Sequence, residues 1–278
     1  MNKLIKILKD LNFDFEIYEQ ISNSETSETF IGKFKNNKSI FKLPKNNNHE
    51  LIVNEYLKNR VIDEIVKKNI TPKVLFLEKK TGLIIYEYFK TDSLNKRLNN
   101  ITKLGKQLKK LHQIKIHKDT KKFEEQFSLY LSVPNLKLDS KYFIDSADLF
   151  NDIKNCKDEH VLSHNDLNTS NVMFNTNVVC FIDFEYLSIN SKYCDLAKLI
   201  DSLKLDEIDT NRLLISYGIK NMSSDIHLKI QKWVLMNTYT ELIWSKLISK
   251  SNNRIFSTEY FSNLKKKIKQ QRQQIKLI

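Results

Sequence analysis

The chain has 278 residues, 41% of them hydrophobic and 28% charged, a balance that excludes an intrinsically disordered protein. It is long enough to bury a core, either as one large domain or as two unequal lobes. The net charge of +13 bears on solubility and on non-specific anion binding, and it does not indicate a fold.

The first 89 residues are rich in predicted strands. Residues 3–10 have the spacing of a short amphipathic helix, and short apolar runs between 15 and 43, separated by the polar turns SNSETS and KNNK, predict a β-meander. The apolar residues of LIVNEYLKNRVIDEIVKK recur every three to four positions, which predicts a helix over 51–68. KVLFLEK and GLIIYEYF predict two more strands, joined by a turn at Thr81-Gly82.

The rest of the chain is rich in predicted helices. ITKLGKQLKKLHQIKI has a helical period, and further helices are predicted over 195–204, 208–218, 225–250 and 257–276. This change along the chain predicts an N-lobe over 1–89 and a C-lobe over 90–278, with a ligand expected where lobes meet.

Cysteine usage and the N-terminal segment bear on the compartment. Cys156, Cys180 and Cys194 include no CxxC pair, so they favour reduced thiols over disulfides or structural zinc. The N-terminal segment has no small-residue cleavage site, and no apolar run approaches the roughly 18 residues that span a bilayer. The sequence therefore predicts a cytoplasmic protein without a transmembrane segment.

Three polar side chains surround a short apolar stretch in the second half of the chain. Asp166 and Asn171 stand five positions apart in HNDLNTSN, and Asp183 follows in FIDFEY. The runs VMF and VVCFI, separated by Asn175-Thr176-Asn177, predict a β-hairpin that returns Asp183 beside the other two. Mg²⁺ prefers one or two carboxylates together with phosphate oxygens and water. The trio is therefore a candidate site for Mg²⁺ and a catalytic base.

The spacing follows the kinase catalytic loop, H-R-D-x-x-x-x-N with a later D-F-G, here present as HND and DFE. In that template Asp166 accepts the proton of the substrate hydroxyl, Asn171 holds a metal ion, and Asp183 bridges the metal to the β- and γ-phosphates. Each of the three residues then has a role in phosphoryl transfer.

The N-terminal half offers the nucleotide-binding residues of the same template. A strand Lys that contacts the phosphates and a helix Glu that positions it are present in order, as Lys42 in SIFKLP and Glu55 in VNEYL, with Glu50 as a rival for the Glu. A Gly-rich phosphate loop is missing. Between the first two strands lies SNSETSET, whose hydroxyls and amides, including Ser24 and Thr26, are candidates to cover phosphates instead.

From about Ile21 to Trp244 the chain resembles the choline/ethanolamine kinases, relatives of the aminoglycoside phosphotransferases. The resemblance is densest in HNDLNTSNVMF, FIDFEY and YCDLAKLI, with weaker similarity in NEYLKN, LIIYEYF and LGKQLKKLH. It implies an α+β, protein-kinase-like fold with a small β-rich N-lobe and a larger helical C-lobe. It also implies ATP- and Mg²⁺-dependent phosphorylation of the choline hydroxyl. LIIYEYF would run into the interlobe connection, which places its Glu87 near the nucleotide.

The resemblance further implies an aromatic and acidic acceptor pocket. A quaternary ammonium cannot donate a hydrogen bond, so π-faces and carboxylates hold it best. The family typically has two Trp one helical turn apart, whereas this chain has Trp244 with Glu241 at the other position. A Glu there favours a primary over a trimethylated ammonium. The candidate substrate residues are Glu185, Tyr186, Tyr193, Tyr239, Glu241 and Trp244.

Several alternatives remain open from the sequence. Within the enzyme class, the acceptor could be ethanolamine, thiamine, an aminoglycoside or a sugar. Outside it, the chain could be a nucleotide-binding pseudokinase, against which the intact Asp/Asn/Asp trio argues, or a basic nucleic-acid-binding module, which would need its Lys residues on one face. The preferred prediction is a small-molecule kinase that binds ATP, Mg²⁺ and an amino alcohol and has no nucleic-acid partner.

Overall fold

The computed structural model describes residues 1–24, 26–45, 60–92, 100–134, 136, 138–154, 160–251 and 256–276. The chain forms two compact units. The first contains Met1–Asn100 and Val172–Glu185, and the second contains Ile101–Asn171 and Tyr186–Ile278. The predicted division into 1–89 and 90–278 used two continuous stretches, whereas the first unit also takes in a short segment from the second half of the sequence.

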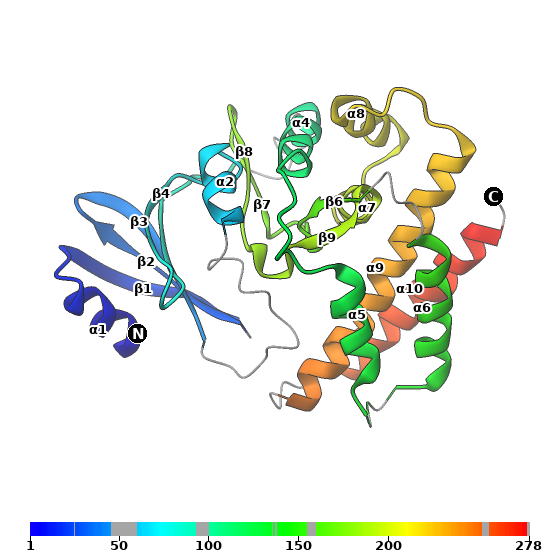
Figure 1. Ribbon diagram of the computed structural model, residues 1–278, viewed down its shortest axis with the longest axis horizontal. Helices are drawn as coiled ribbons and strands as arrows, with labels where there is room; N and C mark the ends of the chain where they lie inside the picture. The colour runs from blue at the N-terminus through cyan, green and yellow to red at the C-terminus, as the bar shows by residue number, and fades with distance from the viewer. Residues whose placement is uncertain are drawn as a thin grey trace. The chain divides into compact units, whose positions relative to one another are not determined.

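The first unit is built on an antiparallel five-stranded sheet with strand order β1-β2-β3-β5-β4 (Figure 1). The predicted meander and the two later strands are present. The strand bounds are β1 (Phe15–Asn23), β2 (Ser27–Phe34), β3 (Asn37–Pro44), β4 (Val74–Glu78) and β5 (Leu83–Glu87). Gly82 has a φ of 76°, which the turn between β4 and β5 requires and which glycine adopts without strain.

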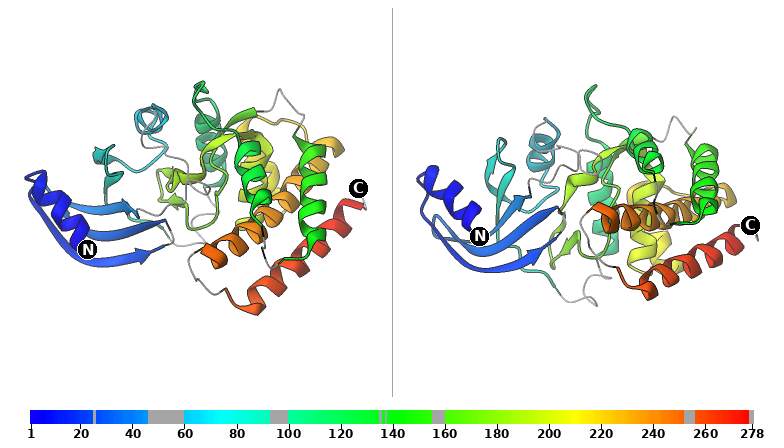
Figure 2. Two further views of the ribbon diagram at one scale, coloured as in Figure 1. Left: turned by 60° about the horizontal axis from the view of Figure 1, so that its bottom comes forward. Right: turned by 90° about the horizontal axis from the view of Figure 1, so that it is seen from below.

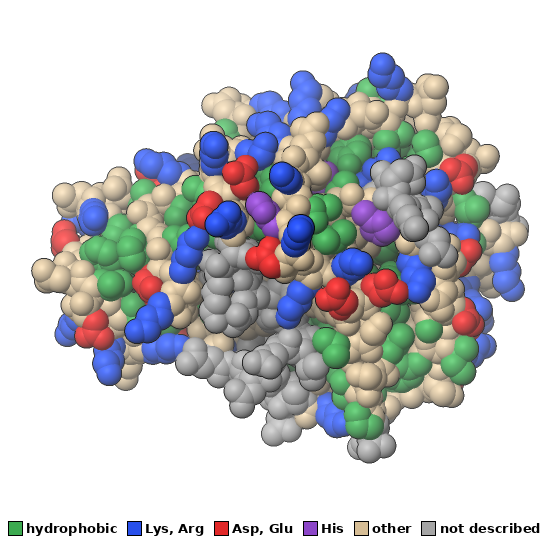
Figure 3. Space-filling view, viewed as in Figure 1, with side chains coloured by type: hydrophobic (Ala, Val, Ile, Leu, Met, Phe, Trp, Pro, Cys, Tyr) green, Lys and Arg blue, Asp and Glu red, His purple; other side chains and the backbone are tan. Residues whose placement is uncertain are grey.

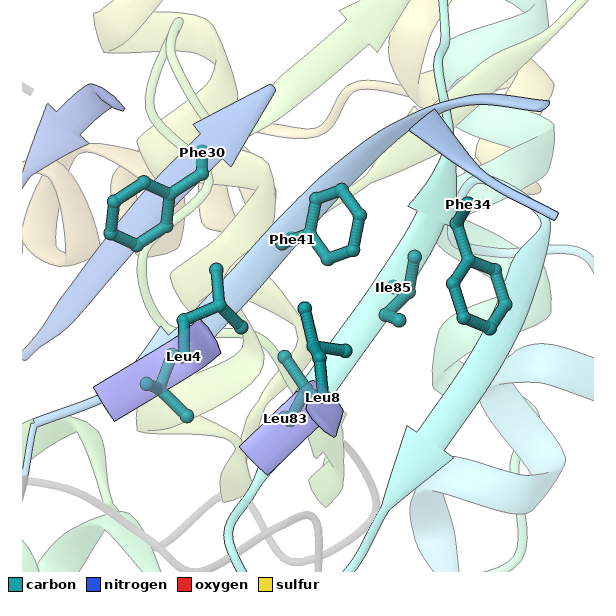
Figure 4. Packing of buried hydrophobic residues seen from close by; sticks show 8 residues of the cluster. Leu4, Leu8, Phe30, Phe34, Phe41, Leu83 and Ile85 are labelled. Carbon is teal, nitrogen blue, oxygen red and sulfur yellow. The ribbon is translucent and has the colours of Figure 1, made fainter. Parts of the chain in front are cut away.

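A helix and the sheet share the apolar core of this unit. Helix α1 (Asn2–Asp10) places Leu4 and Leu8, one turn apart, against Phe30, Phe41 and their neighbours on the sheet (Figure 4). These side chains are fully buried. Buried residues alternate along most of β2 and β3, so the aromatic side chains of these strands lie on the face that contacts α1. The predicted N-terminal helix therefore packs on one face of the sheet.

Two further elements complete the first unit. Helix α2 (Val61–Lys67) is the described part of the helix predicted over 51–68, whose first residues lie outside the described residues. The predicted hairpin is present as β7 (Val172–Phe174) and β8 (Val179–Phe181), which pair Val172 with Phe181. Its turn is closed by the side chain of Asn175, which accepts hydrogen bonds from the amides of Asn177 and Val178 at 3.0 and 2.8 Å.

The second unit is mainly helical. Its helices are α4 (Ile101–His112), α5 (Phe123–Ser132), α6 (Ser140–Ile153), α7 (Lys192–Ser202), α8 (Glu207–Tyr217), α9 (Ser224–Ser251) and α10 (Thr258–Lys276). Helices α9 and α10 run side by side (Figure 2) and share an apolar cluster around Leu242, Leu264 and Ile268. The helices predicted over 195–204, 208–218, 225–250 and 257–276 are thus confirmed within a few residues.

The sequence did not predict the two-stranded sheet of this unit. Strand β6 (His160–Ser163) pairs antiparallel with β9 (Ser188–Ser191), and a 3₁₀ turn, η3 (Phe184–Tyr186), precedes β9. Each strand has only four residues, and the paired residues lie 25 to 31 positions apart, so neither strand shows a clear local pattern. This small sheet fixes the start of the loop that carries Asp166.

No helix among the described residues is both long enough and apolar enough to cross a membrane. On the face shown in Figure 3, the Lys and Arg side chains of the described residues are scattered among Asp and Glu side chains. A basic nucleic-acid-binding module would gather its positive charges on one face, so this face gives that alternative no support.

Candidate active site

The loop after β6 holds Asp166 between two asparagine side chains. Asn168 donates a hydrogen bond from Nδ2 to Asp166 Oδ2 at 3.0 Å, and Asn171 Nδ2 reaches the same oxygen at 2.9 Å. Asn171 Nδ2 also donates to the main-chain oxygen of Asp166 at 2.8 Å. The five-residue spacing therefore closes the loop on itself and fixes the orientation of the Asp166 carboxylate.

A buried carboxylate in the second unit anchors the backbone of this loop. Asp195, in the first turn of α7, accepts hydrogen bonds from the amides of His164 at 2.7 Å and Asn165 at 2.8 Å. Its Oδ2 also lies 3.0 Å from Nε2 of His112 on α4, whose Nδ1 contacts the Tyr217 hydroxyl at 2.8 Å. Burial alone would raise the pKa of Asp195, but the hydrogen bonds outweigh it and the pKa is lowered.

The residue in front of Asp166 adopts an uncommon conformation. Asn165 has a φ of 65°, in the left-handed region that asparagine tolerates better than most side chains. Its Nδ2 donates to the main-chain oxygen of Tyr186 and to Ser188 Oγ, both at 2.8 Å, and its Oδ1 accepts from Asn190 Nδ2 at 2.8 Å. The side chain thus connects the loop to β9, at the position where the kinase template has Arg.

The first unit contains the other part of the kinase pattern. Lys42, on the central strand β3, forms an ion pair with Asp183, which follows β8. Both groups are largely buried, with side chains 15% and 27% exposed. Burial would lower the pKa of Lys42, but Asp183 and Glu185 outweigh it and the pKa is raised. Asp183 has a φ of 70°, and such backbone strain is common at functional sites.

Glu185 lies in the same cluster. Thr26, in the β1–β2 loop, donates its hydroxyl to Glu185 Oε1 at 2.9 Å. Burial, followed by the neighbouring Asp183 carboxylate, raises the pKa of Glu185 to about 8, so it carries a proton at neutral pH. Because Glu185 is neutral, Asp183 is the carboxylate of this cluster that carries the negative charge to which a divalent cation would bind. The oxygen donors fit Mg²⁺.

The structure describes two of the other predicted nucleotide residues, Ser24 and Glu87. Ser24 Oγ accepts from the Ser27 amide at 3.1 Å, and Lys45 binds the main-chain oxygen of Ser24, so the β1–β2 loop is held closed. Glu87 ends β5 with an exposed carboxylate 3.6 Å from Lys73 Nζ. Glu55 and its rival Glu50 lie outside the described residues.

The second unit contains a cavity of about 490 Å³ beside Asp166. Its aromatic lining comes from four segments of the unit: Phe123, Tyr130, Tyr186, Trp244 and Tyr260. The rings of Tyr186 and Trp244 meet edge to face, with centroids 6.4 Å apart and planes at 83°. The size and the mixed apolar and polar lining suit a small organic molecule.

The predicted acceptor residues divide into those that line this cavity and those that do not. Tyr186, Glu241 and Trp244 line it, together with Asp166. Helix α9 contributes residues 237, 240, 241 and 244, which share one helical face. Tyr239 lies on another face, where its hydroxyl accepts from Arg272 at 3.2 Å.

Tyr193 and Glu185 also lie apart from the cavity lining. The ring of Tyr193 is buried, with Lys192 Nζ 5.1 Å from its centroid. Glu185 belongs to the cluster of the first unit described above. The role predicted for these residues in acceptor binding, and for Tyr239, stays a prediction.

Sequence reasoning missed several residues that the geometry brings to this site, among them Asn168, Lys198 and Tyr260. Lys198 on α7 lies 3.6 Å from Asp166 Oδ1 and 3.8 Å from Glu241 Oε2. A signal for it was present, because residues 198, 201 and 202 have the i, i+3, i+4 spacing of one helical face and all line the cavity. His112 gave no such signal, since its partner lies 83 positions away.

Comparisons of the sequence with known proteins found a matching family and a relative. The profile of the phosphotransferase enzyme family matches residues 61–221, which is more than half of the chain. A relative in Mycoplasma capricolum, described as a protein LicA homolog, is 26% identical over 143 residues, covering 50% of this chain and 58% of the relative. The chain therefore matches less than two thirds of that relative's length.

Solved structures share the fold. The choline kinase LicA from Streptococcus pneumoniae superposes with a TM-score of 0.79 at 16% identity, covering 100% of this chain and 99% of that chain. An ethanolamine kinase from Plasmodium vivax superposes with a TM-score of 0.70 at 18% identity, covering 95% and 84% of the two chains. The predicted α+β, kinase-like fold is thus confirmed, while identities this low show the fold alone.

Proposed function

Because the chain belongs to the phosphotransferase enzyme family, we propose that it catalyses the ATP- and Mg²⁺-dependent phosphorylation of the hydroxyl group of choline or a close amino alcohol. One observation carries the proposal most directly. Asp166, the predicted base, lines the same cavity as the aromatic rings of Tyr186 and Trp244. An acceptor bound in that cavity therefore has a carboxylate for its hydroxyl and π-faces for its cationic group.

Asp166 acts on the acceptor hydroxyl. Phosphoryl transfer needs little covalent chemistry from the protein, so the main tasks are to position the hydroxyl and to accept its proton. The hydrogen bonds from Asn168 and Asn171 hold the carboxylate in one orientation, and the Asp195 anchor holds the loop backbone. A side chain fixed in this way costs no reorganisation when the hydroxyl arrives.

Asp183 and Asn171 would hold Mg²⁺, and Lys42 would contact the phosphates of ATP. Because Asn171 turns its Nδ2 to Asp166, its Oδ1 on the opposite side of the amide is the atom that would ligate the metal. Mg²⁺ would neutralise the charge that develops on the phosphate oxygens. Ser24, Thr26, Glu55 and Glu87 remain proposed nucleotide residues.

Choline is the proposed acceptor because the aromatic lining suits a trimethylammonium group. The descriptions of the similar proteins, choline kinase LicA and a LicA homolog, support this choice. Ethanolamine is the second candidate, since the Glu241 carboxylate lines the cavity and an ethanolamine kinase shares the fold. Thiamine and aminoglycosides remain weaker alternatives. The reaction is placed in the cytoplasm, where ATP is available.

The test is direct identification of the product. Purified protein is incubated with ATP and Mg²⁺ and with choline, ethanolamine, thiamine or an aminoglycoside, and phosphorus NMR identifies the phosphate ester that forms. We expect phosphocholine to form together with one ADP per ester. ATP hydrolysis without any ester, or an ester with thiamine or an aminoglycoside alone, would contradict the proposal.

A further inference from the structure

Each of the three carboxylates that line the cavity already has a lysine ammonium or a hydrogen-bond donor beside it. Asp201 accepts from Lys267 Nζ at 2.7 Å. Glu241 accepts from the Tyr260 hydroxyl at 3.1 Å and lies 3.8 Å from Lys198 Nζ. Asp166 lies 3.6 Å from the same Lys198 ammonium. Among the described residues, the lining contains three carboxylates and three lysines. The cavity therefore does not attract a cation by net charge.

Lys198 has the central place in this arrangement. Its ammonium stands between the predicted base and Glu241, and its side chain is only 15% exposed. Burial would lower the pKa of Lys198, but Asp166 and Glu241 outweigh it, the pKa is raised, and the group stays charged at neutral pH. The distances from Lys198 Nζ to Asp166 and to Glu241 are those of ion pairs and exceed normal hydrogen-bond lengths. The ammonium therefore interacts electrostatically with both carboxylates.

This charge balance affects a primary and a quaternary ammonium differently. A primary ammonium loses water when it enters the cavity and needs acceptor oxygens for its three N–H groups. The oxygens of Glu241 are already engaged by Lys198 and Tyr260. A trimethylammonium donates no hydrogen bond and needs only the faces of aromatic rings such as Tyr186 and Trp244. Glu241 on its own would favour the primary amine, and Lys198 cancels that preference.

We propose that Lys198 is a specificity-determining residue of the acceptor cavity: by neutralising Glu241 it directs the site toward a quaternary ammonium alcohol and against a primary one. This inference rests on the proposed function, because it concerns which amino alcohol is phosphorylated. It reverses the preference that the sequence suggested for Glu241. It also assigns a role in acceptor specificity to Lys198, which forms an ion pair with the predicted base Asp166.

The experiment is a double-mutant cycle on Lys198 and Glu241, with choline and ethanolamine as the competing acceptors. The ratio of kcat/KM for the two acceptors is measured in the wild type and in Lys198→Met, Glu241→Gln and the double variant. Loss of orientation at Asp166 slows both acceptors alike and leaves the ratio unchanged, so the ratio reports on specificity alone. For any variant that has lost turnover, calorimetry gives the ratio of the dissociation constants of the two acceptors, which should shift in the same direction.

The expected pattern is asymmetric. In Lys198→Met, the freed Glu241 carboxylate binds the primary ammonium, and the ratio of choline to ethanolamine falls about tenfold or more. Glu241→Gln alone changes the ratio by no more than about twofold, since that carboxylate is already neutralised. The double variant returns to the wild-type ratio within the same margin. Lys198→Arg keeps the charge and the ratio, and the control Lys192→Met removes one charge from α7 outside the cavity lining and keeps the ratio.

Two kinds of failure can be told apart. If the wild type phosphorylates choline but Lys198→Met leaves the ratio unchanged, the role of Lys198 is overturned while the proposed function stands. A wild type that prefers ethanolamine also overturns it. If the wild type phosphorylates no amino alcohol, the proposed function fails and the inference fails with it. Should Lys198→Met not fold, a large shift of the ratio in Glu241→Gln alone would still refute the neutralisation of Glu241.

Discussion

Substitution of Asp195 is expected to destabilise the loop that carries Asp166, because Asp195 binds the backbone amides of that loop. In Asp195→Asn one carboxylate oxygen becomes an NH₂ group, so a donor faces the amide of His164, the amide of Asn165 or the ring of His112. The side chain is completely buried, and water cannot replace the lost acceptor. The variant therefore leaves at least one buried donor unsatisfied beside Asp166.

The size of the effect follows from the contacts. A hydrogen bond to a charged group contributes about 1.5–3 kcal/mol, and a buried donor that is left unsatisfied costs about a further 1–3 kcal/mol. We expect Asp195→Asn to lower the free energy of unfolding by about 3–5 kcal/mol. The exposed pair of Asp152 and Lys232, with side chains 57% and 25% exposed, provides a control, and Asp152→Asn should cost less than about 1 kcal/mol.

The assay is urea unfolding followed by tryptophan fluorescence and circular dichroism at several pH values. Because the folded-state pKa of Asp195 is lowered, its charge stabilises the fold above the unfolded pKa of about 3.9, and that contribution is lost as the pH falls through the folded-state pKa. The difference between the wild type and Asp195→Asn should therefore narrow below about pH 4. Equal losses for Asp195→Asn and Asp152→Asn at neutral pH would refute the anchor role.

Three further predictions concern packing and nucleotide binding. Phe41→Ala removes a fully buried ring from the core between α1 and the sheet, so it should lower the free energy of unfolding by about 3–5 kcal/mol, as measured by urea titration. A loss below about 1 kcal/mol would contradict this packing. Gly105→Ala would place a Cβ against Ser216 Oγ and 2.6 Å from the main-chain oxygen of Leu213, both on α8. It should therefore destabilise by about 1–3 kcal/mol despite the better helix propensity of Ala, and an unchanged melting temperature would disprove the close approach. Lys42→Met should lower kcat/KM for ATP at least about tenfold, because the contact of Lys42 with the phosphates is lost. The control Lys38→Met, on the same strand, should leave kcat/KM for ATP unchanged. Equal kinetics for the two variants would exclude a phosphate-binding role for Lys42.

The sequence predicted the local parts of the fold well. The hairpin β7–β8 follows from two short apolar runs and a turn whose Asn175 side chain closes it, and all of that information lies within ten residues. The helices of the second unit follow from their period. Strands β6 and β9 were missed because their pairing is non-local and each offers only four residues. A pairing of this kind is set by tertiary packing rather than by local propensity.

In the candidate site too, the sequence predicted the local contacts and missed the contacts between distant segments. The Asp166–Asn171 contact follows from spacing within one loop, so the sequence indicated it directly. The contact of Lys198 with Glu241 joins α7 to α9 across 43 positions, and nothing in either helix marks the two residues as neighbours. The predicted preference of Glu241 for a primary ammonium depended on the charge of its surroundings. The positive charge near Glu241 comes from lysines that are distant in the sequence and line the same cavity, so the sequence alone did not show it.

The proposed base, Asp166, would accept the proton of the acceptor hydroxyl in an ATP-dependent transfer. The direct measurement is the kcat of phosphocholine formation by Asp166→Asn, which keeps the shape of the side chain and removes its basicity. A general base contributes about 10²–10⁴-fold, so kcat should fall by at least about a hundredfold while the melting temperature stays near that of the wild type. A folded variant that retains kcat within about tenfold of the wild type would exclude Asp166 as the base.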